Sequence, residues 1–462
     1  MIYKYDRNKG AGNRVDHKEL YETMPVRKAL LKLIIPTVIS QVITVIYNMA
    51  DTFFIGQLND PNQVAAVTLT LPLFMFLTAL SNLFGVGGSA VIARCLGAGN
   101  RERAKHTAAF CVWGAAVLAL CYGILLYSLR AAFLPVLGAD EGTYDFTCRY
   151  IFWIITVGAV PTVLNATLAN LIRSEGYSRQ ASFGVALGGV LNIALDPLFI
   201  FALKLDVAGA AIATMLSNLI ATVYFLLFLR KLGEQTAITP APSMFRMNDK
   251  IPGEVCISGL PSFIMTLMGT ISNATLNYLA STYANTAVAG LGIAKKIDSL
   301  AFMIAQGMTQ GAISLIAYNY ASGNRARMNA AIKNALAITL GVACVILVTL
   351  FFGAKVITAQ FIDDLETVRY GERFLRINCL SAPTTALNYM IITVFQATKE
   401  KTKPLILSFL RKGTLDIPLM LGLNALIGVS GILWATPIAD AIALVIGLFL
   451  FIPYFKKIGF SR

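Results

Sequence analysis

The chain has 462 residues, of which 56% are hydrophobic and 13% are charged, and its mean hydropathy is +0.68. A soluble fold of this composition would lack polar surface, so lipid is the expected solvent for most of the chain. The net charge of +14 comes from Lys and Arg residues scattered between apolar runs. They do not form the basic stripe of a nucleic-acid-binding protein, so no nucleic-acid partner is expected.

Cysteine and histidine usage excludes further kinds of site. The seven cysteines lie mostly within apolar runs and form no CxxC pair, which is typical of small packing residues. The two histidines, His17 and His106, both fall in charged segments. A histidine-based metal site or a His-dependent hydrolase is therefore not expected, and the sequence predicts neither a cofactor nor an enzyme.

Apolar runs recur along the whole chain. The first 29 residues are polar and lack the apolar core and cleavage site of a signal peptide, so they are expected to form a cytoplasmic segment. About twelve runs follow, each long enough to cross a hydrocarbon core of about 30 Å. The predicted spans are residues 30–55, 64–90, 107–129, 150–171, 182–203, 208–229, 254–279, 288–317, 332–354, 374–396, 405–426 and 431–454.

Charges in the connecting segments predict the orientation. An even number of spans puts both chain ends on one side, and the segments of that side carry clusters such as residues 101–105 and 399–403, with several Lys and Arg. The opposite segments carry few basic residues and gather acidic ones such as Asp60 and Asp140. By the positive-inside rule, both ends are expected in the cytoplasm, with the spans in the plasma membrane.

An internal repeat divides the chain. Residues 97–103 (Gly-Ala-Gly-Asn-Arg-Glu-Arg) return as 321–327 (Ala-Ser-Gly-Asn-Arg-Ala-Arg), and residues 207–214 return as 429–436. The sequence therefore predicts an all-α membrane protein with two six-helix lobes, related by a pseudo-two-fold axis along the membrane normal. The predicted parts are a cytoplasmic segment (1–29), a first lobe (30–229), a cytoplasmic linker (230–253), a second lobe (254–454) and a cytoplasmic tail (455–462).

Two acidic residues lie within apolar spans, where an ionisable side chain costs at least about 2.5 kcal/mol. They are Asp51 in the first span and Asp196 in the fifth. Asn192 lies one helical turn before Asp196, and Thr214 should reach the same depth on the next span. These four residues predict an oxygen-lined site for a hard cation such as Na⁺. The two carboxylates would equally serve to share a proton, and the sequence does not choose between the two ions.

Other polar residues in the spans have less specific roles. In the second lobe, Lys295 and Lys296 are expected to snorkel or to pair with Asp298 rather than to line the transport pathway. Asp416 is expected to be neutralised by Arg411 and Lys412. In the first lobe, Asn and Tyr residues form hydrogen bonds between helices as readily as they line a cavity. The candidates for a polar substrate cavity are Gln41, Tyr47, Asn48, Asn165 and Asn170.

Together these features resemble the multidrug and toxic compound extrusion (MATE) transporters over nearly the whole chain. The resemblance is carried by the twelve spans, the Gly-Asn-Arg loops at Asn100 and Asn324, Pro36 in the first span, Asn192, Asp196 and Pro197. Members of this family exchange cationic or amphipathic compounds for Na⁺ or H⁺. The resemblance implies a cation site at Asp51, Asn192, Asp196 and Thr214, and a bend of the first span at Pro36 that gates the cavity.

The sequence also departs from some branches of that family. No carboxylate lies in 255–279 or 374–396, where those branches place a second-lobe cation site, so the first lobe is expected to couple the ion. The alternative is a flippase for a lipid-linked precursor, which would need a strongly cationic cavity. The acidic stretch 363–366 is a single copy and is interpreted as a solvated turn of no catalytic role, and no filter-like loop indicates a channel.

Overall fold

The computed structural model describes residues 18–283, 285–362 and 364–460. His17, most of the predicted amino-terminal cytoplasmic segment and Asp363 of the acidic stretch lie outside these residues. The described chain is helical and contains no β-strand. Within it, nine helices are long and apolar enough to cross a membrane, and a tenth span is formed by Tyr144–Val157 and Ala159–Ser174, which meet at 46°.

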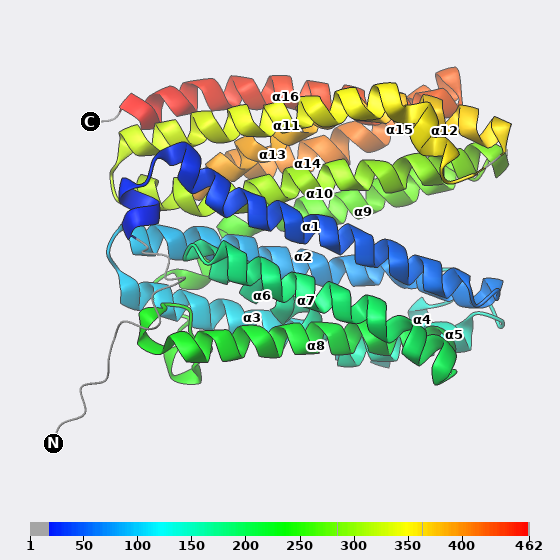
Figure 1. The fold of residues 1–462 in the computed structure, drawn as a ribbon, viewed down its shortest axis with the longest axis horizontal. Coiled ribbons are helices and arrows are strands. Elements are labelled where there is room, and N and C mark those ends of the chain that lie inside the picture. The colour runs from blue at the N-terminus through cyan, green and yellow to red at the C-terminus, as the bar shows by residue number, and fades with distance from the viewer. Residues whose placement is uncertain (1–17, 284, 363, 461–462) are drawn as a thin grey trace.

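The first lobe occupies the lower half of Figure 1. Its fourth and fifth spans each contain a π-helical turn, at Phe152–Val157 and Leu198–Ala202, so these spans consist of more than one segment. The helices of this lobe are α1 (Val26–Gly56), α2 (Pro61–Gly97), α3 (Arg101–Ser128), the short α4 (Arg130–Phe133), α5 (Tyr144–Ile151), α6 (Ala159–Ser174), α7 (Ser178–Pro197) and α8 (Asp206–Leu232).

The second lobe occupies the upper half of the same view (Figure 1). Its helices are α9 (Ile251–Ala280), α10 (Asn285–Ala321), α11 (Arg325–Ala359), α12 (Leu365–Cys379), α13 (Ala382–Ala397), α14 (Thr402–Phe409), α15 (Asp416–Ile427) and α16 (Val429–Phe460). A π-helical turn (Leu410–Leu415) joins α14 to α15. The predicted all-α architecture of about twelve spans in two lobes is confirmed, although spans 374–396 and 405–426 are broken rather than uniform helices.

The repeated Gly-Asn-Arg loop forms the same helix start in both lobes. Asn100 and Asn324 are the N-cap residues of α3 and α11, and each side-chain oxygen accepts a hydrogen bond of 3.0 Å from the backbone N–H three residues later. Gly99 and Gly323 precede them with φ of +74° and +78°, a conformation that favours glycine. The repeat is therefore retained because it caps equivalent helices.

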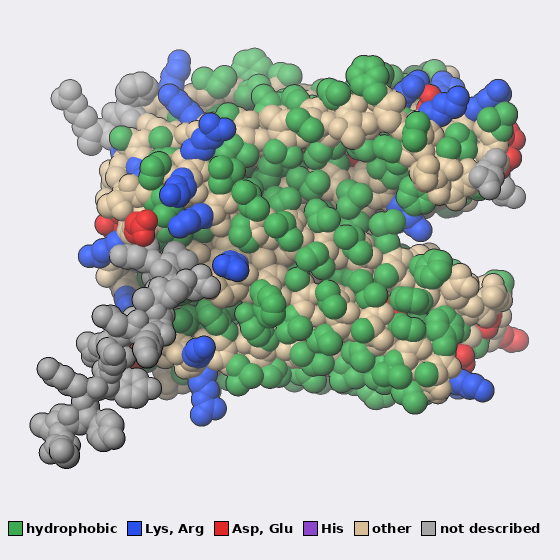
Figure 2. Space-filling model, viewed as in Figure 1, with side chains coloured by type: hydrophobic (Ala, Val, Ile, Leu, Met, Phe, Trp, Pro, Cys, Tyr) green, Lys and Arg blue, Asp and Glu red, His purple; other side chains and the backbone are tan. Residues whose placement is uncertain are grey.

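The two lobes touch at the end of the molecule where α1 begins and α16 ends. Gly87 of α2 lies against Gly259 of α9, and Gly311 of α10 lies against Ile34 of α1, where any side chain on these glycines would clash with the facing backbone. Small residues of this kind let helices approach closely. We call this region the closed end of the molecule. Figure 2 shows that the lobes separate toward the opposite end, leaving a cleft between them.

Polar side chains reinforce the closed end. Arg94 of α2 donates a hydrogen bond of 2.8 Å to the carbonyl oxygen of Gln396 and one of 3.0 Å to Ser258 Oγ, both in the second lobe. Tyr21, in a π-helical turn (Glu19–Thr23) before α1, donates to the carbonyl oxygen of Ser174 at 3.0 Å and accepts at its own carbonyl from Arg327 Nε at 2.6 Å. The segment before α1 thus joins both lobes.

Basic residues mark both ends, though unequally. Lys and Arg side chains are spread over the closed end in Figure 2. The expectation that the opposite end carries few basic residues is wrong for α12, which contains Arg369, Arg373 and Arg376. Arg376 forms an ion pair of 2.9 Å with Glu372. An amphipathic helix at the rim of the lobe accommodates these charges because one of its faces remains in water.

Candidate functional site

Helices α7 and α8 of the first lobe bring three of the predicted site residues together. Asn192 and Asp196 lie one turn apart on α7, with 2% and 0% of their surfaces exposed, and Thr214 lies on α8. Asn192 Nδ2 donates to Asp196 Oδ1 at 3.3 Å and to Thr214 Oγ1 at 3.2 Å. The sequence predicts that Asp196 and Thr214 lie at the same depth, and in the structure the amide of Asn192 bridges them.

Helix α1 adds the fourth residue. Tyr47 of α1 packs against Gly189 of α7, where a side chain larger than hydrogen would meet the tyrosine ring. Asp51 lies one turn further along α1, and its carboxylate is close enough to that of Asp196 for the two to interact electrostatically. Tyr150 of α5 interacts with both carboxylates. The four residues of the predicted cation site therefore converge between α1, α7 and α8.

Three oxygens of this cluster are buried and have no hydrogen-bond partner: Asp51 Oδ1, Asn192 Oδ1 and Asp196 Oδ2. Buried polar atoms are normally partnered, so three unpartnered oxygens in one place indicate a ligand. In the described part of the chain, neither aspartate forms an ion pair with Lys or Arg. The unpartnered atoms of the cluster are all oxygens, which suits Na⁺ or a proton shared between carboxylates.

A chain of amides continues from this cluster into the lobe. Asn218 lies one turn after Thr214 on α8 and donates to its carbonyl oxygen at 3.0 Å. Asn218 also donates to Thr162 Oγ1 at 3.3 Å and accepts from Asn165 Nδ2 at 2.7 Å. Asn165, a predicted cavity residue, therefore belongs to the interior of the lobe. Asn218 was not predicted, although its spacing from Thr214 places both on one helix face.

Two other predicted cavity residues lie between the lobes at the closed end. Gln41 Nε2 donates to Gln310 Oε1 of the second lobe at 3.0 Å. Asn170 Oδ1 accepts from Arg173 Nη1 at 3.2 Å, and Arg173 Nη2 donates to Ser40 Oγ at 3.2 Å. Because α6 ends against the second lobe, Arg173 is only 5% exposed.

The remaining predicted residues of α1 do not meet at one place. Helix α1 is continuous from Val26 to Gly56 and includes Pro36. Asn48 is exposed, and Tyr47 is occupied in packing against Gly189. Pro36 precedes Asp51 by 15 residues, which corresponds to about 22 Å along a helix. It therefore lies far from Asp51, Asn192, Asp196 and Thr214, which we call the cation cluster after its predicted role.

The second lobe holds two buried ion pairs. Arg411 Nε lies 2.5 Å from Asp440 Oδ1, and these side chains are 2% and 1% exposed. Lys412 Nζ lies 2.9 Å from Asp416 Oδ2. The expectation that Arg411 neutralises Asp416 is wrong, because the π-helical turn directs Arg411 toward α16 instead. The sequence offered one signal for Asp440, since it is the single carboxylate in the apolar run 431–454.

Lys295 of α10 lies near these pairs. Its Nζ donates to Asn273 Oδ1 of α9 at 2.5 Å, and it also interacts electrostatically with Asp298 of its own helix.

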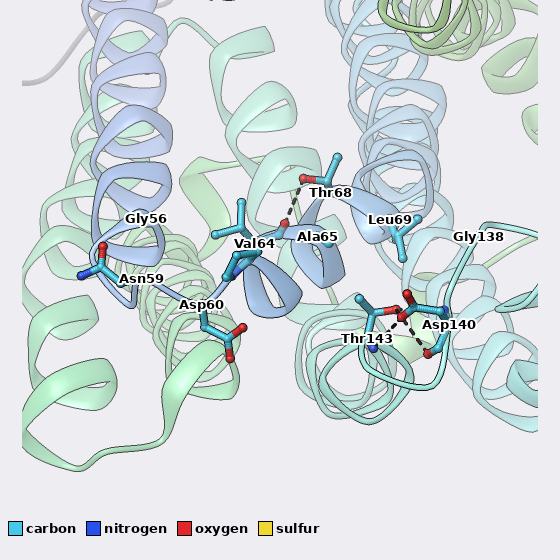
Figure 3. A pocket seen from close by; sticks show the side chains of 11 residues that line it. Gly56, Asn59, Asp60, Val64, Ala65, Thr68, Leu69, Gly138, Asp140 and Thr143 are labelled. Atoms are coloured by element: carbon cyan, nitrogen blue, oxygen red, sulfur yellow. Dashed lines mark hydrogen bonds between the residues drawn. The ribbon is translucent and has the colours of Figure 1, made fainter. Parts of the chain in front are cut away.

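A pocket of about 730 Å³ lies in the first lobe at the end opposite the closed end, beside the turn between α1 and α2 (Figure 3). Its two carboxylates already have partners. Asp60 caps α2 through the N–H of Asn62 at 2.9 Å, and Asp140 accepts from both the backbone and the hydroxyl of Thr143. The hydrogen bonds from Thr143 hold the pKa of Asp140 below its usual range. This pocket therefore offers a ligand fewer free polar groups than the cluster around Asp196.

Comparisons with known proteins agree with the fold of two lobes. The sequence profile of the MatE family matches residues 36–198 and 261–422, one segment in each lobe. The multidrug export protein MepA of Staphylococcus saprophyticus subsp. saprophyticus is 30% identical over 423 residues, covering 91% of this chain and 92% of that protein.

Two solved structures have the same fold over 97% of this chain and 100% of their own. A MATE transporter in complex with MaL6 is 25% identical, with a TM-score of 0.90. An outward-facing multidrug resistance MATE family transporter of the MOP superfamily is also 25% identical, with a TM-score of 0.89. With a family profile matching both lobes and a relative similar along almost its whole length, the chain belongs to the MatE family of multidrug transporters.

Proposed function

We propose that this chain exports small cationic or amphipathic compounds across the plasma membrane in exchange for Na⁺ or H⁺. The cation binds at Asp51, Asn192, Asp196 and Thr214. The observation that carries the proposal is the set of three buried oxygens without partners in the first lobe. A transporter that held these oxygens permanently bare would have to bear the cost of two uncompensated carboxylates.

The direction of exchange follows from the cleft and the charges. Helix α1 begins and α16 ends at the closed end, which also carries most loop lysines and arginines, and the positive-inside rule assigns this end to the cytoplasm. The cleft between the lobes then opens to the outside, as in the outward-facing relative. A cation arriving from outside binds the first lobe in this state and favours release of the exported compound. Coupling requires that the cation bind one state more tightly than the other.

The exported compounds are inferred from the relatives. MepA is a multidrug export protein, and a polyspecific cavity relies on shape and apolar area more than on a motif. The predicted cavity residues contribute differently to this role. Gln41, Asn170 and Pro36 lie toward the closed end and are proposed to gate the cavity, whereas Tyr47 and Asn165 support the cation cluster. Asn48 is exposed on α1 and remains a candidate for substrate contact.

Efflux of ethidium from proteoliposomes tests the proposal. A pH gradient and a Na⁺ gradient are imposed separately, and at least one is expected to drive efflux. Asp51→Asn should abolish the ion-driven component at normal protein yield. The matched control is Asp145→Asn, which changes an exposed carboxylate paired with Arg149 at 2.7 Å. Full ion-driven efflux by well-folded Asp51→Asn, or efflux under neither gradient in the unmodified chain, would contradict the proposal.

A further inference from the structure

The cation cluster of the first lobe has a counterpart in the second lobe. The repeat of residues 207–214 as 429–436 makes Thr436 of α16 equivalent to Thr214 of α8. In each lobe the preceding helix carries a fully buried aspartate, Asp196 or Asp416, at the level of this threonine. Thr436 Oγ1 donates to Asp416 Oδ1 at 2.9 Å. The duplicated lobes therefore both place a carboxylate and a threonine hydroxyl at one buried position.

The residue one turn before the aspartate differs between the lobes. In the first lobe it is Asn192, which leaves Asp196 Oδ2 without a partner. In the second lobe it is Lys412, whose Nζ lies 2.9 Å from Asp416 Oδ2. The first helix of each lobe also contributes, because Ser272 of α9 donates to Asp416 Oδ2 at 2.6 Å. Both oxygens of Asp416 are therefore satisfied by the protein itself.

We propose that the second lobe contains a cation site of the same design, permanently occupied by the ammonium group of Lys412. This inference rests on the proposed function, since it takes the first-lobe cluster to be the exchangeable site. The tethered ammonium supplies the positive charge that Na⁺ or H⁺ supplies to Asp196. Lys412 is thus a specificity-determining residue that prevents the second lobe from taking part in exchange.

The neighbouring charges support this assignment. Lys295 and Asp298 of α10 interact electrostatically with Lys412. Lys295 also interacts with Asp416, but its Nζ donates to Asn273 Oδ1 of α9 at 2.5 Å. The nearby Arg411 is bound to Asp440 by two hydrogen bonds of 2.5 and 3.1 Å, and Thr385 of α13 bonds to both partners. Lys412 is therefore the cation held directly against Asp416.

Replacing the lysine by the residue of the first lobe tests the inference. The variant Lys412→Asn is purified as the full chain, and its thermal unfolding is followed in NaCl or choline chloride at constant ionic strength and at several pH values. Because Asp416 then lacks its counter-charge, the variant should gain stabilisation by Na⁺ or by falling pH. At a Na⁺ concentration about ten times the Kd, Tm should rise by roughly 1.5 °C. Lys412→Arg keeps the charge and should gain no such dependence.

Three further variants make the result specific. Lys412→Asn/Asp416→Asn should lose the new dependence, because no carboxylate remains for a cation to compensate. Lys295→Gln/Lys412→Asn should keep it, which excludes a rescue of Asp416 by Lys295. Lys296→Asn is the matched control, since it removes an exposed lysine of the same lobe. No gain of cation dependence in Lys412→Asn and in Lys295→Gln/Lys412→Asn would overturn the inference.

Failure to fold is also informative. If Lys412→Asn is recovered only in the presence of Na⁺ or at low pH, and the neutral double variant is recovered without either, the inference is supported. Equal loss of both variants would overturn it. All measurements are repeated in an Asp51→Asn background, so that cation binding by the first lobe does not produce the result. If Lys412→Asn gains cation dependence in that background while Asp51→Asn has no effect on transport, the proposed function is refuted and this inference stands.

Discussion

The two lobes of this transporter handle buried carboxylates in opposite ways. In the first lobe, Asp51 and Asp196 approach one another without an ion pair, and each keeps an oxygen with no partner. In the second lobe, Asp416 and Asp440 are each held against a cationic side chain, at 2.9 and 2.5 Å. Equivalent helices of the two lobes therefore form the proposed site for a mobile ion in the first lobe and fixed ion pairs in the second.

This difference distinguishes function from structure within the same fold. A buried carboxylate must be compensated, because leaving a charge unpaired in a low-dielectric interior costs several kcal/mol. When a side chain compensates it, the charge is fixed and removal of either partner damages stability. When a dissociable ion compensates it, the charge state depends on the solution, and the site can be coupled to movement of the lobes.

The largest expected effect comes from breaking a fixed pair. Arg411→Met leaves Asp440 buried and unpaired, so we expect a loss of about 3–5 kcal/mol in the free energy of unfolding. The double variant Arg411→Met/Asp440→Leu should recover most of this loss. Denaturant unfolding of the purified chain measures both. The control Arg149→Met removes an exposed pair and should cost no more than about 1 kcal/mol. Equal losses in the single and double variants would contradict the interpretation.

Neutralising the equivalent aspartates should have opposite effects in the two lobes. Asp196→Asn removes a charge that no cationic side chain of the described residues compensates, so stability should be unchanged or higher while ion-driven efflux is lost. Asp416→Asn leaves Lys412, whose side chain is 16% exposed, without its carboxylate, so stability should fall by about 3 kcal/mol. Thermal unfolding and ethidium efflux of both variants, side by side, provide the measurement. A similar loss of stability in both would remove the distinction between the lobes.

A smaller effect is expected at the closed end. Arg173→Ala removes hydrogen bonds to Ser40 and Asn170, which should weaken the contact between lobes by about 1–3 kcal/mol. The cleft at the other end should then close more often. Spin labels at positions 59 and 365, on a background without native cysteines, report this as a shift toward shorter distances. Unchanged distances would mean that Arg173 does not hold the closed end together.

The smallest effect should be the same in both lobes. Asn100→Ala and Asn324→Ala each remove the side-chain acceptor that caps a helix, at an expected cost of about 1 kcal/mol. Denaturant unfolding of the two single variants tests this equality, with Asn48→Ala as a control at an exposed position. Clearly unequal losses would show that the repeated loop no longer has the same role in both lobes.

Much of the cation cluster was predictable because the rules involved are local. Placing an acidic side chain in an apolar span costs free energy whatever the span packs against. This cost alone identifies Asp51 and Asp196 as candidates. Helical periodicity places Asn192 on the face of Asp196, and the short connection before α8 sets the depth of Thr214. The bridging role of Asn192 could not be predicted in this way, because it depends on side-chain orientation between two helices.

The fixed pairs show where local rules end. Asp440 and Asp51 are each a lone carboxylate in an apolar run, so the sequence signal is the same. Asp440 is fixed in an ion pair, whereas an oxygen of Asp51 has no partner. What separates them is Arg411, which lies 29 residues away along the chain and reaches Asp440 from another helix. Arg173 is similar, since a terminal arginine of α6 is expected in water until the second lobe is known to cover it.

By itself, the sequence determined that the chain lies in lipid, where its helical spans are, that its lobes are duplicated and which carboxylates fall inside apolar spans. Hydrophobic length, charge and repeat spacing are properties of the chain and do not depend on packing. Only the tertiary structure decided which charges are paired and which end of the molecule is closed. Pairing requires two helices to bring particular atoms within about 3 Å of each other, and distant residues acquire that proximity only when the lobes fold and meet.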